Sequence, residues 1–246
     1  MGAHGPHRHV ALGAFLTDSR PQTSARDGRG GFHGRRKGKR LRNRQEELVR
    51  TLLPRLRIEP ARPLAAFASP ISALWLEIGF GGGEHLAAQA RAQPTIGFIG
   101  CEPFVNGIAK LLRVINQDKL DKVRLWDGEA SELIRHLPAG SIDRVDLLYP
   151  DPWPKRRQRK RRFVSDDNLT ALARVMRSGA QLRFATDVDD YAGWVLARVR
   201  RSQDFRWTAA RADDWRLPWS GWPGTRYEAK ARREGRKPIY LVFERI

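Results

Sequence analysis

The stretch Leu74-Trp75-Leu76-Glu77-Ile78-Gly79-Phe80-Gly81-Gly82-Gly83 decides the fold class of this chain. It begins as a compact apolar run and ends in a glycine-rich turn, and residues 84–91 after it have the apolar spacing of a helix. Glycines at such a turn permit a tight bend and let a ligand approach the backbone closely. We therefore predict a nucleotide-type site at the carboxyl end of a buried strand. The turn alone does not identify the ligand, because dinucleotide dehydrogenases use a similar one.

Alternating strands and helices continue outward from this stretch. Further strands are predicted at residues 95–101, 123–126, 143–149 and 180–185, and further helices at residues 45–53, 104–115, 131–137, 166–176 and 189–201. Residues 205–209 and 239–245 form a predicted terminal strand pair, separated by a structureless loop of about 29 residues. We expect an α/β, Rossmann-like fold: a mostly parallel twisted sheet of about seven strands with one antiparallel strand at or near the edge, and helices on both faces.

The first 44 residues differ in composition from the rest of the chain. They are rich in Gly, His, Arg and Ser, and from residue 20 to residue 44 ten residues are Lys or Arg while only Asp27 is acidic. Such a segment cannot bury enough apolar surface to fold alone. We therefore predict a basic, disordered arm over residues 1–44 and one domain over residues 45–246.

The charge of the chain indicates a nucleic-acid partner. Lys and Arg number 46 against 27 acidic residues, so the net charge is +19, and this field attracts phosphate-rich molecules. The cations are bunched rather than interspersed. The densest run is Lys155-Arg156-Arg157-Gln158-Arg159-Lys160-Arg161-Arg162. We expect this run to position phosphates, and a flexible solvated loop is the alternative.

Cysteine usage and hydropathy bear on where the protein works. Cys101 is the only cysteine, so no intramolecular disulfide can form, and the sequence has no Cys/His spacing typical of a metal cluster. The longest N-terminal apolar stretch, residues 10–16, is too short for a membrane span and fits a signal peptide poorly. We expect a cytoplasmic protein without a membrane or metal partner, with an organellar transit peptide as the alternative for the Arg-rich start. A monomer and a homodimer both fit the sequence.

Four acidic residues, Glu77, Glu102, Asp127 and Asp151, end four predicted strands in turn. An open α/β sheet binds its ligands beyond these carboxyl ends. Glu102 follows the glycine turn by nineteen residues, where an acid accepts hydrogen bonds from ribose hydroxyls. These four acids form a negatively charged rim, which repels pyrophosphate but suits a cation such as a sulfonium. It therefore favours S-adenosylmethionine over a nicotinamide cofactor.

Five motifs extend this interpretation to a family. They are Leu76-Glu77-Ile78-Gly79-Phe80-Gly81, Pro150-Asp151-Pro152-Trp153-Pro154-Lys155, Lys160-Arg161-Arg162-Phe163, Ala185-Thr186-Asp187 and Gly224-Thr225-Arg226-Tyr227-Glu228. With these motifs the chain resembles the tRNA (guanine-N7)-methyltransferases from about residue 35 to its end, and the Pro-Asp-Pro-Trp-Pro-Lys signature is the most specific part. The resemblance implies a class I methyltransferase fold and S-adenosyl-L-methionine as cofactor. It also implies N7 of a guanine in tRNA as methyl acceptor, at the family's usual position 46 of the variable loop.

The resemblance also implies roles for individual residues. Asp151 matches a residue treated as catalytic and close to the cofactor. The implied cofactor-binding residues are Glu77, Gly79, Gly81, Glu102, Asp127 and Asp151. The implied substrate-binding residues are Lys155, Asp187, Thr225, Arg226, Tyr227 and Glu228, and the implied RNA contacts are Arg157, Gln158, Arg159, Lys160, Arg161 and Arg162. The chain departs from the family's pattern at Gly82, Pro103 and Gln158, none of which is an acid of the rim.

The chemistry of guanine N7 agrees with these roles. Its lone pair lies outside the aromatic sextet, so attack on a sulfonium methyl needs no deprotonation and no strong general base. Holding N7, methyl and sulfur nearly in line should therefore dominate the rate. We expect Asp151 and Asp187 to accept hydrogen bonds from the guanine N1 and N2 edge and to face the positive charge that passes to the purine. The target base is expected to be unstacked from the folded tRNA.

Three other functions remain open from the sequence. Residues 149–153 resemble faintly the acidic-Pro-Pro-aromatic motif of methyltransferases that act on exocyclic amines. A non-catalytic RNA-binding or chaperone protein that kept the fold would also carry the basic run. A nicotinamide dehydrogenase would carry the glycine turn, although the acidic rim disfavours it. In the terminal loop, Trp215, Trp219 and Trp222 are expected to pack on the core rather than stack on a base.

Overall fold

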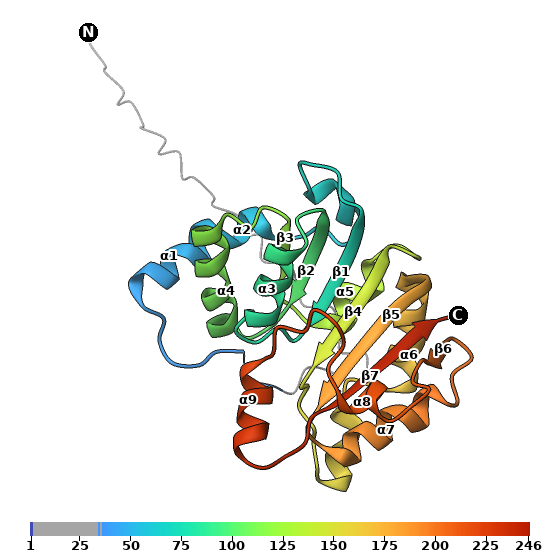
Figure 1. Cartoon of the computed structure of the whole chain (residues 1–246). Coiled ribbons are helices and arrows are strands. Elements are labelled where there is room, and N and C mark those ends of the chain that lie inside the picture. Colours follow the sequence, from blue (N-terminus) through green and yellow to red (C-terminus); the bar gives the residue numbers. More distant parts are fainter. Residues whose placement is uncertain (2–33, 35) are drawn as a thin grey trace.

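A seven-stranded mixed sheet forms the centre of the protein (Figure 1). The computed structural model describes residues 1, 34 and 36–246, so most of the predicted arm lies outside the described residues. The strand order is β3-β2-β1-β4-β5-β7-β6. The strands are β1 (Ala73–Ile78), β2 (Ile96–Cys101), β3 (Val123–Trp126), β4 (Ile142–Leu148), β5 (Met176–Thr186), β6 (Phe205–Trp207) and β7 (Ile239–Arg245). Strand β7 runs antiparallel to both β5 and β6, and the other pairs are parallel, which confirms the predicted mixed sheet.

The strand order reverses between β1 and β4. From β1 the chain builds outward through β2 to β3, and it then returns to add β4 on the other side of β1. Strands β1, β2, β3 and β4 are parallel, so their carboxyl ends meet at one edge of the sheet. In open α/β sheets the crevice beyond this reversal is where ligands bind. The predicted acids therefore lie at or just beyond the carboxyl ends of strands that meet at the same edge.

Helices lie on both faces of the sheet (Figure 1). Two clusters of buried apolar side chains attach them to it. Successive strand residues point to opposite faces, so Phe98 packs with one cluster while its neighbour Ile99 packs with the other. The Phe98 face carries α2 (Leu53–Leu56), α3 (Glu84–Ala92) and α4 (Val105–Asp118), with α1 (Asn43–Thr51) packed against α4. The Ile99 face carries α5 (Ala130–His136), α6 (Asp166–Val175) and α7 (Asp189–Val199). Helices on both faces were predicted, and the structure confirms them.

The segment between β6 and β7 differs from the prediction of a structureless loop. It contains α8 (Asp213–Arg216) and α9 (Arg226–Arg233). Helix α9 begins at a polar cap, where the Thr225 hydroxyl accepts a hydrogen bond from the backbone N–H of Glu228 at 3.0 Å. Apolar periodicity missed this helix because Ala231 is its only buried apolar side chain. The prediction of a 29-residue loop is therefore wrong.

The tryptophans of this segment pack on the core, as expected. The rings of Trp219 and Trp222 meet the ring of Tyr240 edge to face, with centroid distances of 5.8 and 5.7 Å. Trp215 packs against the cluster on the Ile99 face. The segment is thereby attached to β7, and it brings α9 toward the carboxyl edge of the sheet.

Two short 3-10 helices and an N-terminal segment complete the described chain. The 3-10 helices are η1 (Pro63–Ala66) and η2 (Arg156–Arg161). At the N-terminal end, Gly38 donates its N–H to Asn106 Oδ1 at 2.7 Å, and Asn106 Nδ2 donates to the carbonyl of Lys39 at 2.7 Å. The end of the basic arm thus lies against the first turn of α4. Within residues 36–246 no helix is both long and apolar enough to cross a membrane.

Candidate functional site

The glycine turn after β1 leaves its backbone open to a ligand. Gly79 and Gly81 have φ angles of 73° and 57°, in the left-handed region that side chains disfavour. A Cβ atom at Gly79 would meet no heavy atom within 4 Å. The turn is held from β2, because Gly81 donates its N–H to Glu102 Oε2 at 2.8 Å. We call this turn, residues 79–83, the glycine cradle. It lies beside the point between β1 and β4 where the strand order reverses, and the sequence predicted a cofactor there.

Glu102 is a buried carboxylate that closes one side of this cradle. Only 7% of the residue is exposed. Its second oxygen accepts a hydrogen bond from the Phe104 N–H at 2.9 Å. Burial raises the pKa of Glu102. The hydrogen bonds from the two backbone N–H groups lower this pKa and the Asp151 charge raises it, and the net shift is upward. Each carboxylate oxygen keeps a lone pair for another donor, such as a ribose hydroxyl.

Glu77, by contrast, is engaged inside the protein. Its Oε2 lies 2.7 Å from Nδ1 of His85 on α3, and both side chains are buried. Burial opposes the charged imidazolium, but the Glu77 carboxylate outweighs it and raises the pKa of His85. His85 also lies 5.1 Å from the ring centroid of Trp222. The sequence had no signal for His85 beyond its place just after the glycine turn.

Asp127, at the end of β3, is bound by an arginine from far earlier in the chain. Arg57 donates Nε and Nη2 to the two carboxylate oxygens at 2.9 and 2.6 Å. This pairing raises the pKa of Arg57. Arg57 reaches Asp127 because it forms an isolated bridge with Leu125 of β3. Nothing in the local sequence predicts a contact between residues seventy positions apart.

Asp151 lies in a loop whose backbone is strained on both sides. Tyr149 and Trp153 have φ angles of 49° and 42°, which residues other than glycine rarely adopt. The Tyr149 N–H donates to the carbonyl of Ala185 at 2.7 Å, which fixes the start of the loop on β5. The Asp151 carboxylate is exposed, and within the described part of the chain it has no hydrogen-bond or ion-pair partner. It is therefore free to accept a hydrogen bond from a substrate.

The basic run folds as η2 and displays most of its cations to solvent. Lys155, Arg156, Arg157, Lys160 and Arg161 are exposed, while Gln158 and Arg159 are half-buried. The Arg161 guanidinium lies 5.0 Å from the ring centroid of Trp153. Arg162 differs from the other residues of the run, because it is buried. The exposed cations begin directly after the Asp151 loop.

The predicted substrate residues on α9 fall into two groups. Arg226 and Tyr227 lie against the glycine turn: a Cβ atom at Gly81 would stand 3.3 Å from the Tyr227 hydroxyl, and Arg226 pairs with Glu84 at 3.2 Å. Tyr227 is 46% exposed, and its ring stacks on Tyr149 with a centroid distance of 6.5 Å. The start of α9 therefore bridges the glycine turn and the Asp151 loop.

Glu228 and Thr225 face the protein instead. Glu228 accepts hydrogen bonds from Trp222 Nε1 at 2.5 Å, from the Tyr240 hydroxyl at 2.6 Å and from Arg232 Nη2 at 2.8 Å. Burial opposes ionisation of Glu228, but these donors together lower its pKa. Thr225 caps the helix. In this structure both residues hold α9 in place.

Asp187 follows β5 and is paired with a residue that the sequence analysis did not single out. Arg236 donates Nε to Asp187 Oδ2 at 2.5 Å.

The structure thus brings Gly79, Gly81, Glu102 and Tyr227 together at the carboxyl edge, with Asp151 close enough to affect the pKa of Glu102. Several predicted residues are instead held by protein partners that the sequence did not reveal. These are Glu77 with His85, Asp127 with Arg57, and Asp187 with Arg236.

Known proteins similar to this chain agree on one family. A family model described as "Putative methyltransferase" matches residues 72–241. A tRNA (guanine-N(7)-)-methyltransferase of Rhodopseudomonas palustris (strain BisB18) is 54% identical over 219 residues, which covers 87% of each chain. One from Chelativorans sp. (strain BNC1) is 52% identical over 220 residues, covering 87% of this chain and 95% of that protein.

Solved structures support the fold. The aminoglycoside resistance methyltransferase NpmB1 superposes with a TM-score of 0.53 at 16% sequence identity, over 77% of this chain and 95% of that chain. At this identity the likeness concerns the class I methyltransferase fold alone. In this chain the same fold carries acidic residues beside its glycine turn, and both of these relatives are more than 50% identical to it. The chain therefore belongs to the tRNA (guanine-N7)-methyltransferase family, whose cofactor is S-adenosylmethionine.

Proposed function

We propose that the protein transfers the methyl group of S-adenosylmethionine to N7 of a guanine in tRNA, at position 46 of the variable loop, by in-line displacement. One observation carries the proposal: Asp151 is exposed near Glu102 and the glycine turn, and its loop is followed directly by the exposed cations of η2. The acceptor comes from the names of the relatives, which are tRNA (guanine-N(7)-)-methyltransferases at 52% and 54% identity. Cytoplasmic tRNA is the substrate that this proposal implies.

The residues at the carboxyl edge fit the cofactor. S-adenosylmethionine supplies a methyl group on a positively charged sulfur. The glycine turn offers backbone that a ligand can approach, and Glu102 has lone pairs left for ribose hydroxyls. The carboxylates of Glu102 and Asp151 favour a cationic ligand over a pyrophosphate. Asp127 belongs to this rim in the proposal, with its carboxylate oriented by Arg57.

Asp151 acts in this proposal by alignment and charge, not as a base. The Asp151 carboxylate, which has no protein partner among the described residues, accepts hydrogen bonds from the guanine N1 and N2 edge and faces the charge that passes to the purine. Asp187 is already paired with Arg236, so it shares its oxygens with that guanidinium when the base binds. Asp151 is therefore the catalytic residue of the proposal, and Asp187 assists in binding.

The exposed cations of the basic run hold the RNA backbone. Arg157, Lys160 and Arg161 present charge to solvent immediately after the Asp151 loop, together with Lys155. Such contacts position a nucleic acid without reading its sequence. Tyr227 offers an exposed aromatic ring beside the glycine turn, where an unstacked base has a stacking surface.

Mapping the methylated base tests the proposal. The protein is incubated with unmodified tRNA transcripts and cofactor labelled on the methyl group, and the product is cleaved by borohydride and aniline, which act at N7-methylguanosine. We expect label at guanine 46 and none when that guanine is replaced by adenine. Label in methyladenosine would favour an amino-group methyltransferase, and cofactor binding without transfer to any RNA would favour a non-catalytic binder.

A further inference from the structure

Arg162 ends the basic run, but its side chain lies inside the protein. Only 3% of the residue is exposed, whereas Lys160 and Arg161 just before it are exposed. A buried cation cannot reach the phosphates of a bound RNA without leaving its site. The charge of Arg162 therefore has a partner within the protein rather than in the substrate.

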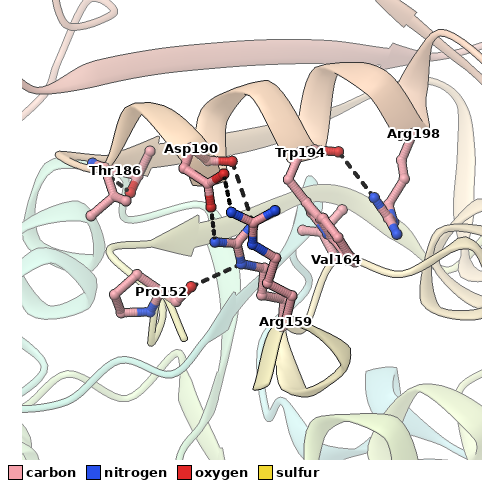
Figure 2. Close-up of polar contacts among 9 residues, drawn as sticks. Pro152, Arg159, Val164, Thr186, Asp190, Trp194 and Arg198 are labelled. Carbon is pink, nitrogen blue, oxygen red and sulfur yellow. Dashed lines mark hydrogen bonds and ion pairs between the residues drawn. The ribbon is translucent and has the colours of Figure 1, made fainter. Parts of the chain in front are cut away.

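The guanidinium of Arg162 joins the Asp151 loop to helix α7. Its Nε donates to the carbonyl of Pro152 at 2.8 Å, and its Nη2 pairs with the carboxylate of Asp190 on α7. Its Nη1 donates to the Asp190 carbonyl at 3.3 Å. The rings of Tyr191 and Trp194 lie 4.7 and 5.0 Å from the guanidinium. Figure 2 shows Pro152, Asp190 and Trp194 arranged around this contact.

The loop that Arg162 holds can donate few backbone hydrogen bonds of its own. Three residues of Pro150-Asp151-Pro152-Trp153-Pro154 are prolines, which have no N–H to donate. The strained Tyr149 and Trp153 stand on either side of Asp151. Strained backbone persists only where the surroundings impose it. The Pro152 carbonyl is one residue from Asp151, so its bond to Arg162 bears directly on where the Asp151 carboxylate stands.

We propose that Arg162 is a positioning residue for methyl transfer, which holds the Pro152 carbonyl against α7 and thereby sets the place of Asp151, and that it does not contact RNA. The inference rests on the proposed function of Asp151. The family resemblance implies RNA contacts for all of residues 157–162, whereas this proposal assigns Arg162 to the support of the Asp151 loop. Because the reaction depends on alignment, a small displacement of Asp151 lowers the rate of the chemical step.

Asp190 also carries a second arginine, which supplies a contrast. Arg159 donates Nη2 to Asp190 Oδ1 at 2.7 Å, and its side chain is 36% exposed (Figure 2). Arg159 and Arg162 thus share one carboxylate, but only Arg162 also reaches the Pro152 carbonyl. A variant at Arg159 reports on RNA binding, and one at Arg162 reports on the loop.

The test is Arg162→Lys in the full-length protein, assayed with saturating S-adenosylmethionine and unmodified tRNA. Lysine keeps the charge but is a compact donor that cannot span the Pro152 carbonyl and Asp190 as the guanidinium fork does. We expect kcat to fall by about ten- to a hundredfold. The KM for tRNA and the salt dependence of tRNA binding should be unchanged. Arg206→Lys, an exposed arginine paired with Glu244, is the matched control and should behave as wild type.

Arg159→Ala supplies the opposite pattern. It should raise the KM for tRNA. It should also reduce the slope of log binding constant against log salt concentration by about 0.7 to 0.9, because one phosphate contact is lost. If Arg162→Lys gave that pattern with kcat intact, Arg162 would be an RNA contact and the inference would be overturned. An Arg162→Lys enzyme with wild-type kcat and KM would overturn it as well.

Asp190→Asn makes the test independent of how well Arg162→Lys folds. It weakens the other end of the contact without replacing any residue of the basic run, although Arg159 also loses part of its pairing with Asp190, so kcat rather than the KM for tRNA is the readout. We expect a similar loss of kcat, and the double variant should lose no more than either single one, because both changes release the same loop. A thermal melt and cofactor titration identify a variant that fails to fold. If Arg162→Lys fails to fold, wild-type kcat in Asp190→Asn overturns the inference.

The inference and the proposed function fail in different ways. If the wild-type protein does not methylate guanine N7 in tRNA, the proposed function fails. If the wild-type protein does so and the Arg162 and Asp190 variants match it, only the positioning role of Arg162 fails.

Discussion

At the scale of single residues, the site is defined by which carboxylates are free. Asp151 is exposed without a protein partner within the described residues, and Glu102 is buried with two backbone donors. Glu77 and Glu228 are occupied by protein partners. Three of these acids lie in family motifs and Glu102 directly follows β2, yet their positions in the fold separate those that can meet a ligand from those that hold the framework.

Replacing Asp151 by Asn should lower the rate of methyl transfer in a single turnover by about a hundredfold. The amide keeps the shape of the side chain but removes the negative charge that faces the developing cation. Affinity for tRNA and for the cofactor should stay within a few-fold of wild type, as measured by filter binding and calorimetry. Full activity in Asp151→Asn at normal RNA affinity would contradict the catalytic role.

The His85 and Glu77 pair should make stability depend on pH. The pKa of His85 is raised above its ordinary value of 6.5, so the imidazolium is more stable in the folded protein than in the unfolded chain. Its contribution is fully present below pH 6.5 and is lost as the pH rises through the raised pKa. The melting temperature should therefore fall over this range, and His85→Gln should flatten the fall. His136→Gln, at an exposed histidine, is the control; an identical fall in both variants would contradict the assignment.

At the scale of elements, α9 shows where sequence reasoning stops. Periodicity correctly predicted the amphipathic helix α4, because its apolar residues form one face that packs on the sheet. Helix α9 offers almost no apolar face and is held by the polar contacts of Glu228 with Trp222, Tyr240 and Arg232. Partners from the preceding loop and from β7 cannot be inferred from the eight residues of the helix itself. Strand β5 likewise begins at Met176, four residues before its predicted start.

Glu228→Gln should loosen α9 without unfolding the domain. A glutamine cannot satisfy the three donors that converge on the carboxylate, and lost hydrogen bonds of a buried charged group cost about 1–3 kcal/mol. We expect faster hydrogen exchange over residues 226–233 and a higher KM for tRNA, because Arg226 and Tyr227 lose their fixed positions. Glu47→Gln, at an exposed residue of α1, should change neither. Unchanged exchange in α9 would show that the cap at Thr225 suffices.

At the scale of the whole molecule, the net charge is +19, and two groups of its cations lie near the site. The exposed cations of η2 follow the Asp151 loop directly, and the end of the basic arm lies against the start of α4 at the same edge of the sheet. The field of the molecule therefore favours the approach of RNA to the carboxyl edge.

The salt dependence of tRNA binding should report this arrangement. Each of Arg157→Ala, Lys160→Ala and Arg161→Ala should reduce the slope of log binding constant against log salt by about 0.7 to 0.9, since each removes one phosphate contact. Arg206 is an exposed residue of β6, the edge strand at one end of the sheet. Arg206→Ala should therefore leave the slope unchanged. Equal slopes in all four variants would mean that η2 does not bind the RNA backbone.

The sequence by itself determined the succession of strands and α-helices from β1 to β6, the glycine turn and the acids near the strand ends, because periodicity and turn residues act over a few neighbouring positions. Only the tertiary structure decided which of these groups remain free for a ligand. Arg57, Arg236 and Asp190 reach Asp127, Asp187 and Arg162 from distant parts of the chain, and such pairings arise when the sheet closes. For the same reason Arg162, one cation among seven in its run, lies in the framework of the site, while the exposed cations before it face the solvent.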